Sequence, residues 1–351
     1  MDVACFSTKP YDSSFLGEAT QGSSHAIRFL EPALDASTVA LAAGNDAVCV
    51  FVNDDLNANV IAQLSRSGVK YIALRCAGFN NVDRRAAKDF GLRIARVPRY
   101  SPFAVAEHTV GLILTLNRRI HKAYNRIREN NFSIDGLLGF DLNGRTFGLI
   151  GTGAIGIVLA KIMRGFGCRV LLHDPFPSEE AGQYGTYVML DELLHESHLV
   201  SLQCPLTSET HHLINAERLS RMRDGAMLVN TSRGGLVDAS AAIEALKSGK
   251  LGGFALDVYE EESGVFFEDL SAEVIQDDVL SRLMTFPNVL ITSHQAFFTR
   301  EALETIASTT RFNLDCFQNE DACPNEVFWQ DEQAKSPSVA EPASSEEASG
   351  S

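Results

Sequence analysis

A glycine-rich turn in the middle of the chain sets the strongest limit on its fold. Gly151, Gly153 and Gly156 lie in the segment GTGAIG, which follows the apolar run TFGLI (146–150) and opens the amphipathic segment 157–167. A glycine turn between a buried strand and a helix is typical of dinucleotide-binding sheets, in which the amides of the helix N-terminus bind a pyrophosphate. The segment therefore predicts a parallel α/β domain that binds a dinucleotide.

Each glycine of this turn has its own expected role. Gly151 allows the tight turn, Gly153 lets backbone amides approach the pyrophosphate, and Gly156 lets the helix pack on the strand. A second strand-like run ends at Asp174, 18 residues after Gly156, about where a carboxylate accepts hydrogen bonds from the adenosine ribose. A carboxylate there would repel a 2′-phosphate, so we expect NAD rather than NADP. The alternative for Asp174 is an acidic loop residue that precedes a proline.

The position of the glycine turn indicates a second domain. About 145 residues precede its strand, and they carry their own alternation of apolar runs and helical segments. Such alternation predicts parallel sheets with helices on both faces, and ten strands are many for one sheet. The nucleotide domain is therefore expected to be inserted in another α/β domain. The predicted strands cover residues 3–7, 47–52, 70–76, 92–97, 146–151, 169–174, 198–203, 226–231, 252–258 and 288–293.

Prolines mark the first domain boundary. Pro98 and Pro102 enclose three residues that can neither continue a strand nor lie inside a helix. Ser101 is expected to cap a helix that begins with Pro102 and runs to about residue 129. At the other end, segment 331–351 carries a net charge of −4 and has no aromatic residue, so we expect it to be a disordered acidic tail.

Charge and composition exclude several classes of function. The chain has 45 acidic and 30 basic residues, a formal net charge of −15, whereas nucleic-acid-binding and polybasic membrane-binding proteins present basic surfaces. No apolar run is long enough to span a membrane. We expect neither nucleic acid nor membrane as a partner. The seven cysteines form no CxxC pair, which favours buried thiols in a reducing cytoplasm over disulfides or a metal site.

Three polar segments follow predicted strands downstream of the turn. They contain Arg233, the three acids 260–262, and His294. Because carboxyl ends of parallel strands meet at one edge of a sheet, these side chains could converge. A guanidinium can bind a carboxylate through two parallel hydrogen bonds, and a carboxylate beside a histidine keeps the imidazole protonated for general acid catalysis. Each also has a simpler explanation when taken alone: Arg233 as a surface arginine, the acids 260–262 as a solvated loop, and His294 as a structural histidine.

In these segments and in several others, the chain resembles the NAD-dependent D-2-hydroxyacid dehydrogenases, and within them the fermentative D-lactate dehydrogenases. The resemblance spans about residues 1–328 and implies a Rossmann NAD domain (101–297) inserted in a flavodoxin-like catalytic domain (1–100 and 298–330). The matching segments include FVNDD (51–55), GVKYIALRCAGFNNVD (68–83), RVPRYSPFAVAEH (96–108), GTGAIG (151–156), CPLT (204–207), NTSRGGLVD (230–238), DVYE (257–260) and HQAF (294–297).

The resemblance also implies roles for single residues. Arg233 matches the substrate-binding arginine, Glu262 the carboxylate partner and His294 the acid/base, while Gly78 and Tyr100 match substrate contacts. No metal is implied. The implied cofactor contacts are Gly151, Gly153, Ala154, Ile155, Gly156, Asp174, Cys204, Pro205, Thr210, Thr231, Ser232 and Asp257.

The implied reaction is reversible hydride transfer between NADH and pyruvate, giving D-lactate in a cleft between the domains, by a cytoplasmic homodimer or homotetramer. Two alternatives stay open. One is a dehydrogenase for another acid, such as glyoxylate or a bulkier 2-oxo acid. The other is a non-enzymatic protein that senses NAD(H), although such a sensor need not keep all three of Arg233, Glu262 and His294. The candidate walls that would select the substrate are Phe51, Val52, Tyr100, Phe297 and Phe298.

Overall fold

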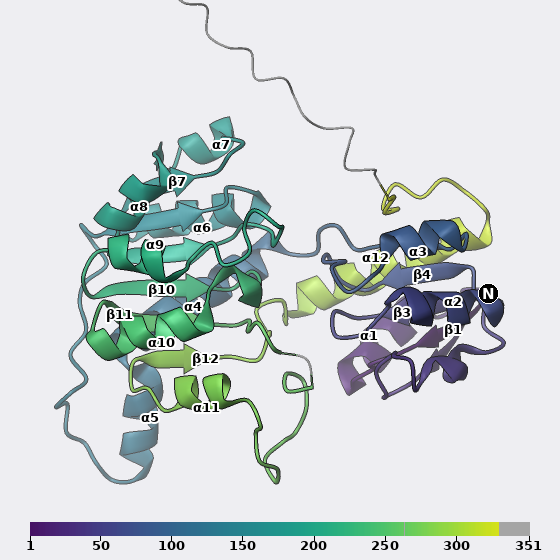
Figure 1. Cartoon of the computed structure of the whole chain (residues 1–351), viewed down its shortest axis with the longest axis horizontal. Helices are drawn as coiled ribbons and strands as arrows, with labels where there is room; N and C mark the ends of the chain where they lie inside the picture. Colours follow the sequence, from purple (N-terminus) through teal and green to yellow (C-terminus); the bar gives the residue numbers. More distant parts are fainter. Residues whose placement is uncertain (263, 330–351) are drawn as a thin grey trace, which may run out of the picture. The chain divides into compact units, whose positions relative to one another are not determined.

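The computed structural model describes residues 1–262 and 264–329, which form two compact units (Figure 1). One unit contains Met1–Pro98 and the residues from Thr309 onward, and the other contains Arg99–Ser308. Both units are built on parallel sheets. The predicted acidic tail, 331–351, lies outside the described residues.

The first unit has a five-stranded parallel sheet in the order β2-β1-β3-β4-β5, the order of flavodoxin-like folds. Its central strands are apolar and buried, as expected for a sheet with helices on both faces. The strands are β1 (Asp2–Cys5), β2 (Ala26–Phe29), β3 (Ala47–Val50), β4 (Tyr71–Leu74) and β5 (Arg93–Ala95). The helices before β5 are α1 (Pro10–Thr20), η1 (Val39–Ala42), α2 (Ala58–Arg66) and α3 (Arg84–Asp89).

The second unit has a seven-stranded parallel sheet in the order β12-β11-β10-β9-β6-β7-β8. Counted from β6, this is the doubly wound order of dinucleotide-binding domains, and it reverses between β6 and β9. The strands are β6 (Thr146–Ile150), β7 (Arg169–His173), β8 (Thr186–Tyr187), β9 (Leu199–Leu202), β10 (Ala226–Asn230), β11 (Leu251–Leu256) and β12 (Val289–Ile291).

Along each strand, successive apolar side chains point to opposite faces of this sheet. On both faces they pack against helices. In β10, Leu228 belongs to one apolar cluster, whereas Met227 and Val229 belong to the other. The second cluster includes residues of α4 (Pro102–Arg118) and α6 (Ala154–Gly165). The first includes residues of α8 (Leu190–Glu196), α9 (Ala216–Arg221), α10 (Ala239–Ser248) and α11 (Asp278–Met284).

The predicted fold class is confirmed, and all ten predicted strands are present. Two further strands, β2 and β8, were not predicted. The predicted helix 102–129 is wrong in one respect, because it ends at Arg118 and a separate helix, α5 (Ile120–Arg128), follows. Arg119 between them has a left-handed backbone with φ of 52°, which an α-helix cannot contain. Its beginning is as predicted, since the Ser101 side chain accepts a hydrogen bond from the Ala104 amide.

The division between the units falls inside helix α12 (Arg300–Gln318), at Thr309. The sequence places the return to the first domain at residue 298. The second unit also contains the short helix α7 (Glu179–Gly182).

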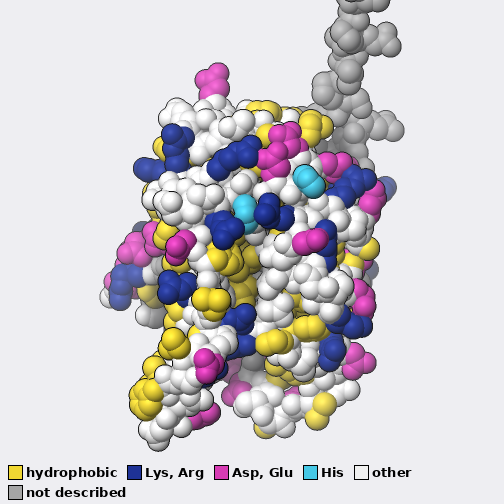
Figure 2. Space-filling model, turned by 90° about the vertical axis from the view of Figure 1, so that its left-hand side faces the viewer, with side chains coloured by type: hydrophobic (Ala, Val, Ile, Leu, Met, Phe, Trp, Pro, Cys, Tyr) yellow, Lys and Arg dark blue, Asp and Glu magenta, His cyan; other side chains and the backbone are white. Residues whose placement is uncertain are grey.

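The surface shown in Figure 2 has no field of a single sign. Basic and acidic side chains are interspersed on this face, with apolar side chains between them. Such a mixture differs from the continuous basic stripe of nucleic-acid-binding proteins. In the described part of the chain, no helix combines the length and the apolar character that a membrane crossing requires.

Candidate active site

The three predicted catalytic residues all follow strands at one edge of the second unit's sheet. Arg233 follows β10, Glu262 follows β11 and His294 follows β12. These strands are neighbours in the order β12-β11-β10 and are parallel, so their carboxyl ends lie side by side. This is the edge at which open α/β sheets bind ligands.

His294 and Glu262 form a direct pair. The Nδ1 atom of His294 lies 3.1 Å from Glu262 Oε1, and the two side chains are 15% and 26% exposed. A hydrogen bond at Nδ1 orients the ring and leaves Nε2 available for proton transfer. The prediction that Glu262 is the carboxylate near His294 therefore has a matching geometry, whereas Glu260 lies against two other histidines.

The backbone of His294 is held in a strained conformation. Its φ is +47°, in the left-handed region that costs a non-glycine residue about 1–2 kcal/mol. The amide of His294 donates a 2.6 Å hydrogen bond to the carbonyl of Asp257, which holds this conformation. Strain of this kind is found at functional sites, where surrounding contacts fix the position of a reactive side chain.

Asp257 organises the loop that carries His294. Its buried carboxylate accepts hydrogen bonds from Thr292 Oγ1 (2.5 Å) and from the amides of Gln295 and Ala296 (2.9 Å each). His108 Nε2, from helix α4, lies 3.4 Å from the same carboxylate. Burial by itself raises the pKa of Asp257, but these hydrogen bonds outweigh it, and the pKa is lowered. Asp257 thus remains an acceptor that fixes the His294 loop.

Arg233 lies at the start of the 3₁₀ turn η2 (Gly234–Leu236), directly after β10. One guanidinium nitrogen donates to the Ser232 carbonyl at 2.6 Å. Among the described residues, no carboxylate forms an ion pair with it, so its remaining donors can bind an anionic ligand. A Cβ at Gly234 would lie 2.0 Å from the carbonyl carbon of Tyr259. Glycine at this position therefore lets the Arg233 segment approach the loop that carries Glu262.

The glycine turn has the geometry expected for a nucleotide-binding turn. Gly151 has a φ of +99°, and a Cβ there would lie 2.6 Å from the Cys204 amide nitrogen. A Cβ at Gly156 would lie 2.2 Å from the Gly151 carbonyl oxygen. At Gly153 the space is open, and this glycine caps α6 without any side-chain hydrogen bond. The N-terminus of α6, where helices commonly bind phosphate groups, therefore begins at a residue with no neighbouring atom within 4 Å of its Cβ position.

Asp174 follows β7 and is connected to this turn. Its Oδ2 accepts hydrogen bonds from the amide (2.7 Å) and the hydroxyl (3.1 Å) of Thr152. Its Oδ1 accepts from the Phe176 amide at 2.9 Å. The Tyr187 hydroxyl donates to the Thr152 hydroxyl at 2.8 Å. The carboxylate is therefore fixed beside the glycine turn, where the sequence predicts a ribose contact.

Four of the other predicted cofactor residues form side-chain hydrogen bonds in the segments after β9 and β10. Thr231 Oγ1 accepts from Gln203 Nε2 and pairs with Thr109 Oγ1, both at 2.8 Å. The Ser232 hydroxyl donates to the Cys204 carbonyl at 2.6 Å. Burial raises the pKa of the Cys204 thiol to about 11, so it stays protonated and unreactive near neutral pH. Thr210 donates its hydroxyl proton to the Pro205 carbonyl, which shapes the loop after β9.

The two predicted substrate-contact residues lie in different units. Tyr100 belongs to the second unit, where its ring meets Phe297 edge-on at 6.5 Å, three residues after His294. Gly78 belongs to the first unit, in the loop after β4, where its carbonyl lies 3.3 Å from Cys76 Sγ.

Sequence reasoning did not identify His108, Thr109 and Gln203 as members of the site. His108 contacts Thr292 at 3.2 Å as well as Asp257. These residues lie on α4 and after β9, far in sequence from their partners. The only indication for His108 was that it ends segment 96–108, one of the segments that match the family. That match assigns no role to His108.

Comparison with known proteins assigns this arrangement to a family. The family profile "D-isomer specific 2-hydroxyacid dehydrogenase, NAD binding domain" matches residues 110–296. The chain is 52% identical to D-lactate dehydrogenase of Escherichia coli (strain K12) over 328 residues, which cover 93% of this chain and 100% of the relative. The chain belongs to the D-isomer-specific 2-hydroxyacid dehydrogenases. Its cofactor is NAD, and its reaction is oxidation or reduction at C2 of a hydroxy or oxo acid.

Two further comparisons extend over most of the chain. It is 54% identical to "2-hydroxyacid dehydrogenase A" of Aspergillus oryzae over 331 residues, covering 93% of this chain and 95% of the relative. The apo structure of D-lactate dehydrogenase from Escherichia coli superposes with a TM-score of 0.85 at 49% identity, covering 93% of this chain and all of that one. These matches cover both units of the chain, so the family assignment applies to both units and not only to the NAD-binding domain.

Proposed function

We propose that this dehydrogenase interconverts pyruvate and D-lactate, with Arg233 as the substrate-binding cation and His294 as the general acid/base. The observation that carries the proposal is the His294–Glu262 pair, 3.1 Å apart at the strand ends next to Arg233. Relatives at about half identity are named for D-lactate, which supports the choice of this substrate.

In the direction of reduction, Arg233 binds the carboxylate of pyruvate and stabilises the negative charge that develops on the carbonyl oxygen. Protonated His294 donates the proton from Nε2 to that oxygen, and in oxidation Nε2 accepts it from the hydroxyl. Glu262, bonded to Nδ1, keeps the ring oriented and stabilises its protonated form. Gly78 and Tyr100 are proposed to contact the substrate carboxylate and methyl group.

The residues around the glycine turn fit NAD. Amides at the start of α6, beside the open space at Gly153, would hold the pyrophosphate, and Asp174 would accept hydrogen bonds from the adenosine ribose. When bound, NADH supplies the hydride that reduces C2 of the 2-oxo acid. Asp257 keeps the His294 loop in place, and the Thr231 network shapes the wall of the cofactor site.

A substrate panel tests this proposal. The purified protein is mixed with NADH and, separately, with pyruvate, glyoxylate and bulkier 2-oxo acids, and the handedness of the product is determined. We expect the largest kcat/KM with pyruvate and a D product. A larger value for glyoxylate or a bulkier acid would replace pyruvate by that substrate, and the absence of turnover with every acid would overturn the enzymatic role.

Replacing Asp174 by alanine is expected to weaken the preference for NAD over NADP by about tenfold or more, equivalent to about 1.4 kcal/mol. The carboxylate repels a 2′-phosphate, and its removal removes that repulsion. The measurement is the ratio of kcat/KM for NADH and NADPH. Asp174→Asn is the matched control, because it removes the charge but keeps an acceptor for the Thr152 amide. Unchanged selectivity in both variants would contradict the assignment.

We also propose that the protein forms a homodimer or homotetramer through helix α5 and the segment after it. No residue of α5 is buried, and Ile120, Tyr124 and Ile127 are 51%, 61% and 52% exposed. Leu138 is 90% exposed, and residues 134–141 with Arg118 line a hollow of about 560 Å³. An apolar surface of this kind on a globular protein marks an interaction site, and oligomers of this family commonly associate through the nucleotide domain.

The double substitution Tyr124→Glu and Ile127→Glu is expected to shift the protein to a monomer, because it places charges in an apolar interface. Sedimentation velocity measures the change. Met284→Glu is a matched control, since Met284 is 58% exposed on α11, and we expect it to leave the assembly unchanged. A wild-type monomer, or a double variant with the wild-type mass, would contradict the proposed interface.

A cytoplasmic location is proposed as well. Six of the seven cysteines are buried, and Cys204 is partly buried. Buried thiols of this number are typical of proteins in a reducing compartment.

A further inference from the structure

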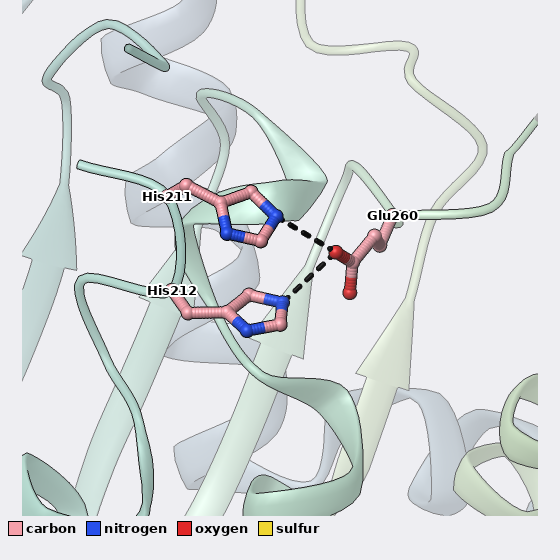
Figure 3. A group of neighbouring side chains, drawn as sticks. All are labelled: His211, His212 and Glu260. Carbon is pink, nitrogen blue, oxygen red and sulfur yellow. Dashed lines mark hydrogen bonds and ion pairs between the residues drawn. The ribbon is translucent and has the colours of Figure 1, made fainter. Parts of the chain in front are cut away.

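A cluster of three side chains outside the proposed catalytic pair has the composition of a metal site. Within the described residues, His211, His212 and Glu260 form such a group, and their potential ligand atoms all lie within 4.8 Å of one another. Figure 3 shows both imidazole rings directed at the same carboxylate. The cysteine pattern gave no reason to expect a metal, but these residues lie apart from the cysteines and are brought together only by the fold.

We propose that His211, His212 and Glu260 bind one divalent transition-metal cation of the Zn²⁺ class. Two imidazoles and one carboxylate are the ligand set of many three-residue zinc sites, in which water completes the coordination. Imidazole ligands favour Zn²⁺, Co²⁺, Ni²⁺ and Cu²⁺ over Mg²⁺ and Ca²⁺, which prefer oxygen ligands.

The spacing of the ligand atoms fits this coordination. Glu260 Oε1 lies 2.9 Å from His212 Nε2 and 3.4 Å from His211 Nε2. Ligands about 2.0–2.1 Å from a tetrahedral Zn²⁺ lie roughly 3.3 Å from one another. The observed distances lie on either side of that value. The three side chains are 29–53% exposed, so a cation can enter from solvent and the ligands can adjust by small rotations.

The backbone segments that carry the ligands are fixed by one intervening turn. The amide of His212 donates a 2.8 Å hydrogen bond to the Gly235 carbonyl. Gly234 packs so closely on the other loop that a Cβ there would lie 2.3 Å from the Glu260 amide nitrogen. The same turn therefore positions both halves of the cluster. A metal site built on fixed backbone loses less conformational entropy when it binds.

The two histidine rings lie against each other. Their rings stack with centroids 4.0 Å apart and an interplanar angle of 24°, and His212 has a left-handed backbone with φ of 48°. Both Nε2 atoms face Glu260 Oε1, so the two rings and the carboxylate direct three potential ligand atoms at the same small region.

An occupied site would join the loop after β9 to the loop after β11. The first loop carries Cys204 and Pro205, which the family resemblance implies as cofactor contacts, and the second carries Glu262. The cation would therefore restrain both loops at once. This consequence rests on the proposed function, but binding of the cation does not.

Direct binding measurements on the full-length protein test the site. Zn²⁺ binding is followed by competition with a chromophoric chelator, and Co²⁺ binding by its ligand-field absorption. We expect one cation per chain with micromolar affinity, and no competition from Mg²⁺. His211→Asn, His212→Asn and Glu260→Gln are each expected to weaken binding by at least about tenfold. Asparagine is chosen for His212 because it tolerates the left-handed backbone.

The matched control is His195→Asn, which removes an exposed histidine of α8 that is not part of the cluster; it should bind as the wild type does. Amide hydrogen exchange gives a second readout, since Zn²⁺ should slow exchange in residues 207–212 and 258–261 of the wild type but not of His211→Asn. Wild-type affinity in the cluster variants, or no Zn²⁺ bound per wild-type chain, would overturn the site. Neither readout uses turnover, so a failed substrate assay would leave it standing.

Discussion

Replacing His294 by glutamine is expected to lower kcat for pyruvate reduction by about 10²–10⁴-fold, the usual contribution of general acid–base catalysis. Glutamine fills a similar volume and can donate a hydrogen bond to Glu262, but its amide N–H is far too weak an acid to protonate the carbonyl oxygen. Binding of NADH should change by no more than about twofold, because the glycine turn and Asp174 lie on other strands. The measurements are stopped-flow turnover and quenching of protein fluorescence by NADH.

Glu262→Gln provides the comparison for this result. It keeps an acceptor for His294 Nδ1 and removes the charge that stabilises the imidazolium, so its kcat should fall less than that of His294→Gln. Undiminished turnover in His294→Gln would rule out the acid/base role. A loss of NADH binding equal to the loss of kcat would instead indicate that the variant has disturbed the fold, because His294 has a strained backbone held by Asp257.

Most of the fold could be predicted because buried parallel strands are continuous apolar runs with glycines or prolines near their ends. β2 was missed because its four residues are alternately exposed at the edge of the sheet, and β8 because it has two residues. The break between α4 and α5 could not be predicted, since Arg119 is an ordinary helix-forming residue type and nothing in the local sequence marks its left-handed backbone.

The site was predictable where its residues follow strands, because strand order places their ends together. The distinction between Glu260 and Glu262 was taken from the family pattern, and in the structure the two acids contact different histidines. The network of His108 with Asp257 joins a helix to a strand end 149 positions away. No local pattern reports such a contact. The cluster of His211, His212 and Glu260 could not be predicted for the same reason, because the two histidines and the glutamate follow different strands.

Replacing Arg233 by lysine is expected to raise KM for pyruvate by about 10- to 100-fold, at saturating NADH. A guanidinium can bind the carboxylate and the carbonyl oxygen through a planar fork of donors, whereas an ammonium reaches one of them at a time. The loss of one charge-assisted hydrogen bond costs about 1.5–3 kcal/mol, which corresponds to this range. Because the same guanidinium stabilises charge on the carbonyl oxygen, kcat should fall as well.

The matched control for Arg233→Lys is Arg223→Lys, which changes an exposed arginine of the same unit just before β10 and should leave both constants unchanged. Steady-state kinetics with pyruvate measure KM, and NADH binding is measured separately to show that the cofactor site is intact. An unchanged KM in Arg233→Lys would mean that the substrate carboxylate is bound elsewhere. Because Arg233 has no carboxylate partner among the described residues, the substitution breaks no internal ion pair there, and a raised KM reports the lost contact with the substrate.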